Sequence, residues 1–151
     1  MNTDNHEIEI KLDLRQDIDA MVKLRLHRYN IKHCQYMEEH SSYTHNDKTH
    51  ANFGIFINDE CFGGAVGYIR FGWYMLTDFC IDESLRGQGI GKEIIRQIEE
   101  FAKKNNCIGV QMDTWNFQAP EFYKKLGYTV WGEFKDCPPG TTHYYLYKKF
   151  I

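Results

Sequence analysis

The chain of 151 residues lacks any apolar run long enough to cross a bilayer, so we expect no membrane span. Its opening residues, MNTDNHEIEIKLDLRQD, are polar and charged, which is not the composition of a secretory signal peptide. An excess of basic residues is also missing. The formal net charge is -3 and the isoelectric point is about 6.1, which argues against a general nucleic-acid-binding protein. We therefore expect neither a membrane nor a nucleic acid among its partners.

Paired cysteines are missing as well. The cysteines are odd in number, scattered and without a CxxC pair: Cys34, Cys61, Cys80, Cys107 and Cys137. This pattern indicates reduced, mostly buried thiols of a cytoplasmic protein, not a disulfide framework or a zinc site.

Repeats, linkers and low-complexity tracts are absent, and the length suits one core, so we expect a single domain over residues 1–151. Alternating and helix-spaced apolar residues predict the elements in turn. Strands are expected over 6–14, 51–60, 61–73, 74–81, 107–115, 128–134 and 142–150. Helices are expected over 17–34, from Ile90 to Ala102 and over 119–127, with a loop or broken helix over 35–50. The first hairpin should turn at Asn58 and Asp59. This order predicts an α/β or α+β fold with a mixed sheet.

The stretch RGQGIG, residues 86–91, places three glycines where a strand gives way to a helix. Glycine costs about 1 kcal/mol against alanine inside a helix, so their presence needs a reason. A glycine-rich turn leaves the first N–H groups of the helix uncovered, and the helix dipole adds a positive end, which together suit a phosphate or pyrophosphate. The Walker A spacing fails by one residue and the Rossmann GxGxxG spacing also fails, whereas R-x-x-G-x-G matches fully.

Two motifs carry a resemblance to a known family. DFCIDESLRGQGIGKEII, residues 78–95, closely resembles the acetyl-CoA-binding motif of the GNAT family of N-acetyltransferases. NFQAPEFYKKLGY, residues 116–128, resembles the other hallmark of the family, and the two motifs stand in its usual order and spacing. The closing PPGTTHYYLYKKF resembles a bacterial, small-molecule-type branch of the same family.

The resemblance implies a fold with a central, splayed mixed sheet flanked by helices. It implies acetyl-CoA as cosubstrate, no metal, and direct transfer of the acetyl group to a primary amine of a small molecule without a covalent enzyme intermediate. A homodimer is among the partners that the family suggests. Two alternatives stay open: transfer of a different acyl group, and a coenzyme A-binding sensor or interaction module without turnover.

The resemblance also implies which residues form the active site, when the functional positions of the family motifs are transferred to this sequence. Tyr123 would protonate the departing thiolate, and a backbone N–H near Ile81 would polarise the acetyl carbonyl. The coenzyme would contact the strand before the loop, the loop itself and one later asparagine. These residues are Phe79, Cys80, Ile81, Arg86, Gly87, Gln88, Gly89, Ile90, Gly91, Lys92 and Asn116.

The group that deprotonates the attacking ammonium is left open. Asp78 stands in an apolar strand, where an acid is out of place without a partner, and by alternation it should share a face with Leu76 and Cys80. It is therefore a candidate for a base, an ammonium anchor or a hydrogen-bonded structural acid. Glu133 and His143 are further base candidates, although each type of residue more often lies at the surface or packs, and a water chain could also relay the proton.

Two other features favour unremarkable interpretations. His40, His45 and His50 are five residues apart, which is not the spacing of metal ligands on a helix, so we read the segment as a polar loop. The resemblance to the family implies that this segment borders the acceptor pocket. Cys80 is expected to be a small buried side chain and not a nucleophile.

Overall fold

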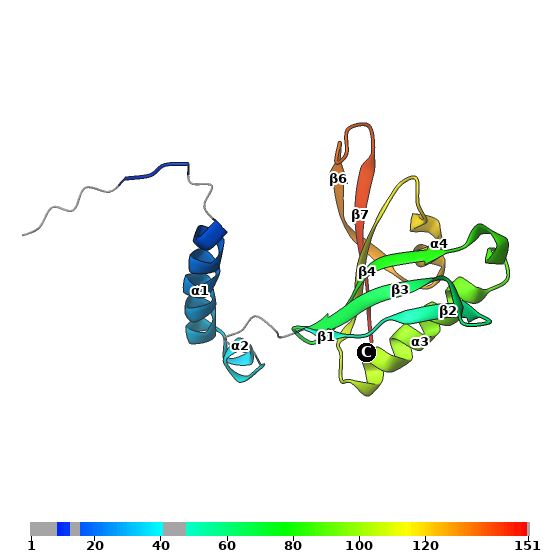
Figure 1. The fold of residues 1–151 in the computed structure, drawn as a ribbon, viewed down its shortest axis with the longest axis horizontal. Helices are drawn as coiled ribbons and strands as arrows, with labels where there is room; N and C mark the ends of the chain where they lie inside the picture. Colours follow the sequence, from blue (N-terminus) through cyan, green and yellow to red (C-terminus); the bar gives the residue numbers. More distant parts are fainter. Residues whose placement is uncertain (1–8, 13–15, 41–47, 151) are drawn as a thin grey trace, which may run out of the picture. The chain divides into compact units, whose positions relative to one another are not determined.

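The computed structural model describes residues 9–12, 16–40 and 48–150 (Figure 1). Contacts between residues divide the chain into two units, 1–46 and 47–151, and each is described by itself. The expectation that residues 1–151 form one domain stays a prediction. No helix within the described ranges is both long and apolar enough to cross a membrane.

The first unit contains two helices, α1 (Gln16–His33) and α2 (Gln35–His40). The predicted helix over 17–34 is confirmed, and α2 accounts for part of the segment expected to be a loop or broken helix. The strand predicted over 6–14 is wrong where it can be checked, because residues 9–12 form no strand; Ile8 and Leu14 lie outside the described residues. Ile10 and Leu12 are 94% and 86% exposed. Alternation shapes one face of a strand, but a strand also needs a neighbour for its backbone N–H and C=O groups.

The second unit is built on a sheet of seven strands. These are β1 (Thr49–His50), β2 (Phe53–Ile57), β3 (Glu60–Arg70), β4 (Trp73–Ile81), β5 (Gly109–Trp115), β6 (Thr129–Lys135) and β7 (Thr142–Lys149). The strand order is β1-β3-β4-β5-β7-β6, and β2 also pairs with β3. Only the β4–β5 pair is parallel among these pairings, so the predicted mixed sheet is confirmed.

Local sequence explains the hairpins. Asn58 and Asp59 join β2 to β3 with φ values of 47° and 65°, the left-handed conformations of a type I′ turn. The predicted turn is therefore confirmed. The last two expected strands, over 128–134 and 142–150, also pair as the β6–β7 hairpin, which extends away from the rest of the sheet in Figure 1.

Helix α3 (Ile90–Lys104) packs across β3, β4 and β5 with the apolar stripe that the sequence predicts. Its inward side chains Ile95, Ile98 and Ala102 are at most 2% exposed. Short helix α4 (Pro120–Lys125) lies beside the first turn of α3, since a Cβ on Gly91 would be 3.2 Å from the Phe122 ring. One 3-10 turn, η1 (Glu83–Leu85), precedes the glycine loop.

The cysteine prediction is partly wrong. All five thiols are free, as expected, but only Cys107 is buried, whereas Cys34, Cys61, Cys80 and Cys137 are exposed. Composition suggests a typical environment for a residue type, while the position of each strand and loop decides its actual exposure.

A partly buried ion pair ties α3 to β7. Lys148 Nζ donates to the two carboxylate oxygens of Glu99 at 2.9 and 3.0 Å and to the carbonyl oxygen of Leu126 at 2.9 Å. The hydroxyl of Tyr128 donates to the same carboxylate at 3.1 Å. The Glu99 side chain is 13% exposed and that of Lys148 is 31% exposed, so water replaces these bonds only in part.

We expect Lys148→Met to lower the free energy of unfolding by about 2 kcal/mol. The value lies below the usual cost of breaking a fully buried pair because Lys148 is partly solvated. Chemical denaturation measures the change. Lys149→Met, at the exposed neighbouring position, is the control and should stay within about 0.5 kcal/mol of the parent protein. Equal stability of the two variants would show that the ion pair between Lys148 and Glu99 does not stabilise the fold.

Candidate functional site

Strands β4 and β5 separate part-way along their length. Their parallel pairing runs from Trp73 and Gly109 to Leu76 and Met112 and stops there. β4 nevertheless continues to Ile81 beside β3, and β5 continues to Trp115 beside β7. The sheet therefore opens between two strands that are each held on their other edge.

A cavity of about 840 Å³ occupies this opening. Residues 77–81 of β4 and 113–115 of β5 form two of its walls. The loop and the start of α3, residues 85–87 and 89–92, close one end, and Phe122 and Tyr123 of α4 cover it from the helical side. Most of the residues singled out from the two sequence motifs thus meet around one space.

The glycine loop has the geometry that its sequence suggests. Gly87 and Gly89 have φ values of +75° and +79°, a backbone conformation that L side chains rarely adopt, and a Cβ at either position would meet nothing within 4 Å. Gly89 is the N-cap of α3, and no side chain caps the helix there. Open space therefore lies beside uncovered N–H groups, as an anion site requires. Gly91 serves a different purpose, because it lets α3 approach Phe122 closely.

Two cations stand at the same end of the cavity. Arg86 and Lys92 both line it. Arg86 Nε donates to the carbonyl oxygen of Ile81 at 2.9 Å, which fixes the side chain across the loop. With the helix N-terminus, these residues make this end electropositive.

The edge of β4 that faces the opening keeps backbone groups available. The N–H of Asp82 donates to Phe62 O on the β3 side. Backbone polar groups alternate in direction along an antiparallel pair, so those of Phe79 and Ile81 face the opening and those of Cys80 face β3. Phe79 and Ile81 are therefore the members of the predicted set that can pair with an extended ligand through the backbone, although the Ile81 carbonyl oxygen already accepts from Arg86 and mainly its N–H is available.

Asp78 lies at the opposite end of the cavity from the glycine loop, beside a β-bulge. The pairing passes from Val66–Asp78 to Gly67–Leu76, which leaves Thr77 as the extra residue. The bulge reverses the alternation: Leu76 is buried, whereas Asp78 and Cys80 are exposed. The expectation that Asp78 shares a face with Leu76 is therefore wrong, and so is the expectation that Cys80 is buried.

The surroundings of Asp78 also narrow its possible roles. Its carboxylate lines the cavity. Within the described part of the chain, no residue forms a hydrogen bond or an ion pair with this carboxylate. Asp78 therefore lacks the hydrogen-bond partner that a structural acid would need among the described residues.

Tyr123 is 6% exposed and lines the cavity from α4. Its ring lies against Phe79 and Phe122, with centroids 6.5 and 5.1 Å away. Burial, and after it the negative charge of Asp113, raise the pKa of the Tyr123 phenol above its usual value of 10.0. The hydroxyl therefore keeps its proton at neutral pH and can act as a donor.

Asp113 is the acid that the sequence analysis missed. It follows the last β5 residue paired with β4, lines the cavity, and lies 2.6 Å from His143 of β7 (Oδ2 to Nε2). An acid among alternating Ile108, Val110 and Met112 is as unexpected as Asp78 in its own strand, and this signal could have identified it.

Three other predicted residues lie elsewhere. Gln88 is absent from the lining of this cavity, and its Nε2 donates to Ser84 O at 3.2 Å. Asn116 does not line the cavity either; its Oδ1 accepts from the N–H of Thr142 at 3.0 Å and so joins the end of β5 to β7. Glu133 is likewise outside the lining, and its charge acts on Lys124. Their functional roles remain predictions.

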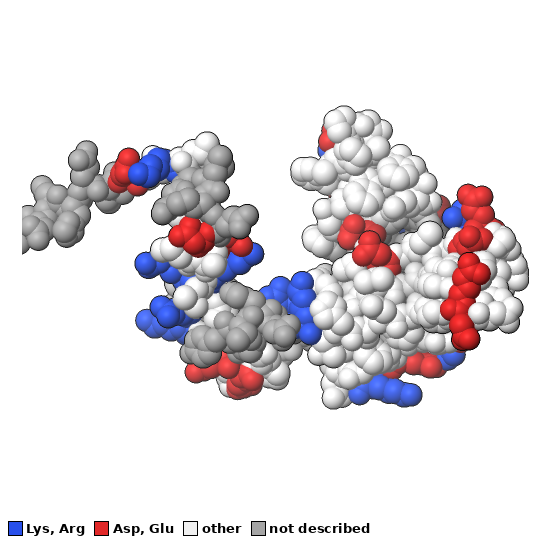
Figure 2. Space-filling view, viewed as in Figure 1, with Lys and Arg blue, Asp and Glu red and all other residues white. Residues whose placement is uncertain are grey.

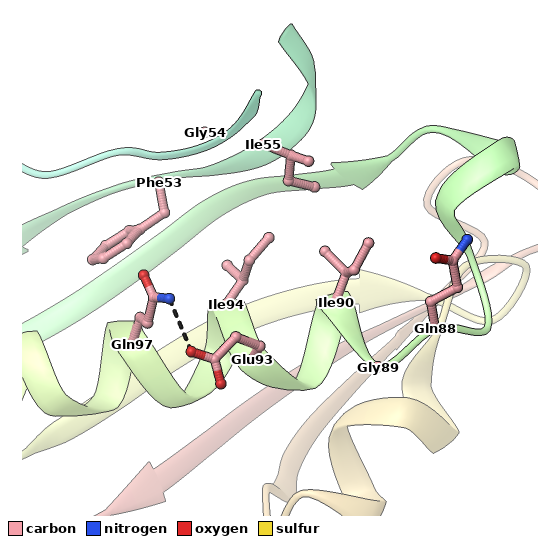
Figure 3. Close-up of a pocket in the computed structure, with 9 residues that line it drawn as sticks. All are labelled: Phe53, Gly54, Ile55, Gln88, Gly89, Ile90, Glu93, Ile94 and Gln97. Carbon is pink, nitrogen blue, oxygen red and sulfur yellow. Dashed lines mark hydrogen bonds between the residues drawn. The ribbon is translucent and has the colours of Figure 1, made fainter. Parts of the chain in front are cut away.

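A second, smaller cavity of about 520 Å³ lies between β2 and the start of α3. Figure 3 shows Phe53 and Ile55 of β2 on one side and Ile90 and Ile94 of α3 on the other. Its one carboxylate, Glu93, accepts hydrogen bonds from Arg96 and Gln97, which hold its pKa at about 2. Its lining contains no lysine or arginine and its acid is already engaged, so the larger cavity is the candidate active site.

Among the described residues, no group of three or more His, Cys, Asp or Glu side chains is arranged to hold a metal ion. His40 ends α2 and His50 lies in β1, whereas His45 is outside the described residues.

Comparison with known proteins agrees with this geometry. Residues 18–128 match the model of the acetyltransferase (GNAT) family. Over 103 residues the chain is 35% identical to a blasticidin-S acetyltransferase of Streptomyces morookaense, a match that covers 68% of this chain and 76% of that protein. The structure resembles an acetyltransferase from Bacillus cereus with a TM-score of 0.82 at 26% identity, covering 94% of this chain and 98% of the other.

A more distant structure shares the fold alone. It is an acetyltransferase of Bacillus anthracis in complex with acetyl coenzyme A, 22% identical with a TM-score of 0.62 over 68% of this chain and 64% of that one. The family match extends over most of the chain, and the relative from Streptomyces exceeds 30% identity over most of both sequences. The chain therefore belongs to the GNAT family of acetyltransferases, as its two motifs predict.

Proposed function

We propose that this acetyltransferase transfers the acetyl group of acetyl-CoA directly to a primary amine of a small molecule. One observation carries the proposal: a single cavity in the opened sheet has an electropositive end at Arg86 and Lys92 and an acidic end at Asp78 and Asp113. The first end suits the phosphates of a coenzyme and the second suits an ammonium group.

The donor site is supported by the loop and the open edge of β4. The uncovered N–H groups at residues 88–92, together with Arg86 and Lys92, would bind the pyrophosphate. The backbone groups of Phe79 and Ile81 would pair with the pantetheine arm as an added strand does. The distance from Ile81 to Asp78 is about 10 Å at the rise of an extended strand, so an arm along β4 would lead from the phosphate end toward the acids.

Positioning supplies much of the rate in a direct transfer, because both reactants are held in one cavity. A backbone N–H of β4 near Ile81, at the acidic end of the arm, would polarise the acetyl carbonyl. Tyr123 would donate its phenolic proton to the sulfur as the C–S bond breaks. Asp78, exposed in the cavity, would attract the cationic acceptor.

A small-molecule acceptor is supported by the relative that acts on blasticidin S and by the limited size of the cavity. We propose that the reaction takes place in the cytoplasm and that one domain carries it out. A homodimer stays a prediction from the family. Two alternative functions remain: transfer of another acyl group, and coenzyme A binding without turnover. The following experiment distinguishes both from acetyl transfer.

We expect the protein to release thiol from acetyl-CoA in the presence of at least one amine of a mixed panel, with an N-acetylated product of matching mass. The panel should contain polyamines, amino acids and aminoglycoside-like antibiotics. Propionyl-CoA and succinyl-CoA, tested in parallel, should react more slowly. A faster reaction with either would reassign the donor. Binding of coenzyme A by thermal shift, with no product from any amine or donor, would favour the sensor function.

A further inference from the structure

Asp113 occupies the point where β5 leaves β4. Its neighbours along the strand, Met112 and Thr114, are 5% and 2% exposed and belong to the helix-covered face. The Asp113 side chain is 37% exposed and lies on the opposite, open face, where it lines the cavity. Figure 2 shows acidic side chains gathered over the middle of the sheet, near β4, among uncharged ones.

His143 holds this carboxylate from the neighbouring strand. Its Nε2 lies 2.6 Å from Asp113 Oδ2, and the residue is 9% exposed. The imidazole is stacked on Trp115 with a centroid distance of 4.2 Å and an interplanar angle of 9°, and Tyr145 packs 4.6 Å away. The ring is therefore fixed between aromatic side chains, and it occupies only one oxygen of Asp113. The second oxygen remains for a ligand.

The acceptor needs such a group. A primary amine with a pKa of about 10.4 is almost entirely ammonium at neutral pH and cannot attack a thioester until it loses a proton. The titratable groups around Asp113 come from three elements. They are His143 and the cross-strand partner Tyr145 of β7, Tyr123 of α4, and Asp78 and Cys80 of β4, which line the same cavity. No lysine or arginine is among these groups, and the two cations that line the cavity, Arg86 and Lys92, lie at its phosphate end.

We propose that Asp113, positioned by His143, binds the ammonium of the acceptor and takes its proton. This inference rests on the proposed function and adds the missing base to it. The N–H bond of the ammonium breaks and its proton passes to Oδ1 of Asp113, while His143 keeps its proton on Nε2 and its hydrogen bond to Oδ2.

The remaining atoms balance. The freed lone pair forms the C–N bond to the acetyl carbon, the C–S bond breaks, and Tyr123 gives its proton to the sulfur. The second proton of the amine nitrogen replaces the one that Tyr123 gave, and the proton on Asp113 leaves to water. Asp78, which has no such support from a neighbouring ring, attracts the cation without removing the proton.

Asp113→Asn tests the proton transfer through its pH dependence. We expect kcat/KM for the best amine to fall about 1,000-fold at pH 7, because the amide cannot take a proton. The kcat/KM of the variant should then rise about tenfold per pH unit and come within about threefold of the parent enzyme near pH 10, where the free amine is abundant. Asp59→Asn, the same substitution at an exposed acid in the β2–β3 turn outside the cavity, should keep the parent profile.

Asp78→Asn tests the assignment of Asp78 as an ammonium anchor. We expect this variant to raise KM for the amine and to keep the slope of the parent pH profile. A steep profile for Asp78→Asn with a parent-like profile for Asp113→Asn would move the base to Asp78 and overturn the proposal. No turnover by the parent enzyme would instead contradict the proposed function, and this inference with it.

His143 is tested as a positioning residue with two substitutions. His143→Gln keeps a donor for Oδ2 and should retain at least about a third of the parent kcat/KM at pH 7. His143→Leu removes the donor and should show the loss and the steep pH profile of Asp113→Asn, with coenzyme A still raising its melting temperature. Equal activity of both variants would overturn the positioning role, and equal loss in both would make His143 a proton carrier instead.

Discussion

Replacing Tyr123 by phenylalanine is expected to lower kcat about 100-fold and to leave the affinity for coenzyme A within twofold of the parent value. The change removes one buried hydroxyl from the cavity wall and keeps the ring that packs against Phe79 and Phe122. General acid catalysis contributes about 100-fold or more to a rate, equivalent to about 2.7 kcal/mol of barrier. Steady-state kinetics gives kcat, and calorimetric titration with coenzyme A gives the affinity.

Tyr128→Phe is the matched control. Tyr128 is also buried, its pKa is likewise raised by burial, and its ring centroid lies 6.1 Å from that of Tyr123. Its hydroxyl, however, donates to Glu99 and does not line the cavity. We expect this control to lose about 1 kcal/mol of stability and to keep its kcat. If Tyr128→Phe slowed turnover as much as Tyr123→Phe did, the effect would belong to packing and not to proton donation.

The pH dependence of the parent enzyme provides a second check on Tyr123. Because burial raises the pKa of this phenol above 10.0, the resting hydroxyl is protonated at lower pH and is ready to donate when the substrate binds. We therefore expect no loss of kcat from ionisation of Tyr123 between about pH 6 and pH 10. A fall in kcat over this range that is absent from Tyr123→Phe would show that the phenol ionises at lower pH.

Gly89→Val is expected to raise the Kd for coenzyme A about 100-fold. Valine at a φ of +79° is strained, so the loop should relax to negative φ and turn the N–H groups at the start of α3 away from the phosphate site. Losing one or two hydrogen bonds to a charged group, at about 1.5–3 kcal/mol each, accounts for this change. Isothermal titration with coenzyme A measures it.

The chain offers a closely matched control for this loop. Gly140, between β6 and β7, also has a φ of +79°, and a Cβ there would meet nothing within 4 Å. Gly140→Val should therefore lose similar stability, about 1–2 kcal/mol, without changing the Kd for coenzyme A. Weaker binding in both variants would mean that general destabilisation, and not the glycine loop, controls affinity.

Local features were predictable from the sequence because a few neighbouring residues decide them. The turn at Asn58 and Asp59, the apolar stripe of α3 and the positive φ of Gly87 and Gly89 depend on residues adjacent along the chain. The two GNAT motifs are local in the same sense, and so the family and the mixed sheet followed from them. The fold prediction failed at residues 9–12, where alternation gave no information about a pairing partner.

The candidate site was predictable only in part. Arg86, the glycines and Tyr123 were identified from motif residues, and they meet around one cavity. The orientation of Asp78 could not be predicted, because the extra residue at Thr77 turns the side chains that follow it in β4 to the opposite face of the sheet. No local pattern distinguishes a bulged strand from a regular one of similar composition.

By itself, the sequence determined that a helix starts at an uncapped glycine turn, that a tyrosine follows on a short helix, and that the chain is a GNAT acetyltransferase. Only the tertiary structure decided which acids face the opening between β4 and β5. Asp113 and His143 are 30 residues apart, and they meet because β5 and β7 pair in one register. A shift of that register by one residue would turn either side chain to the opposite face of the sheet, since side chains alternate along a strand.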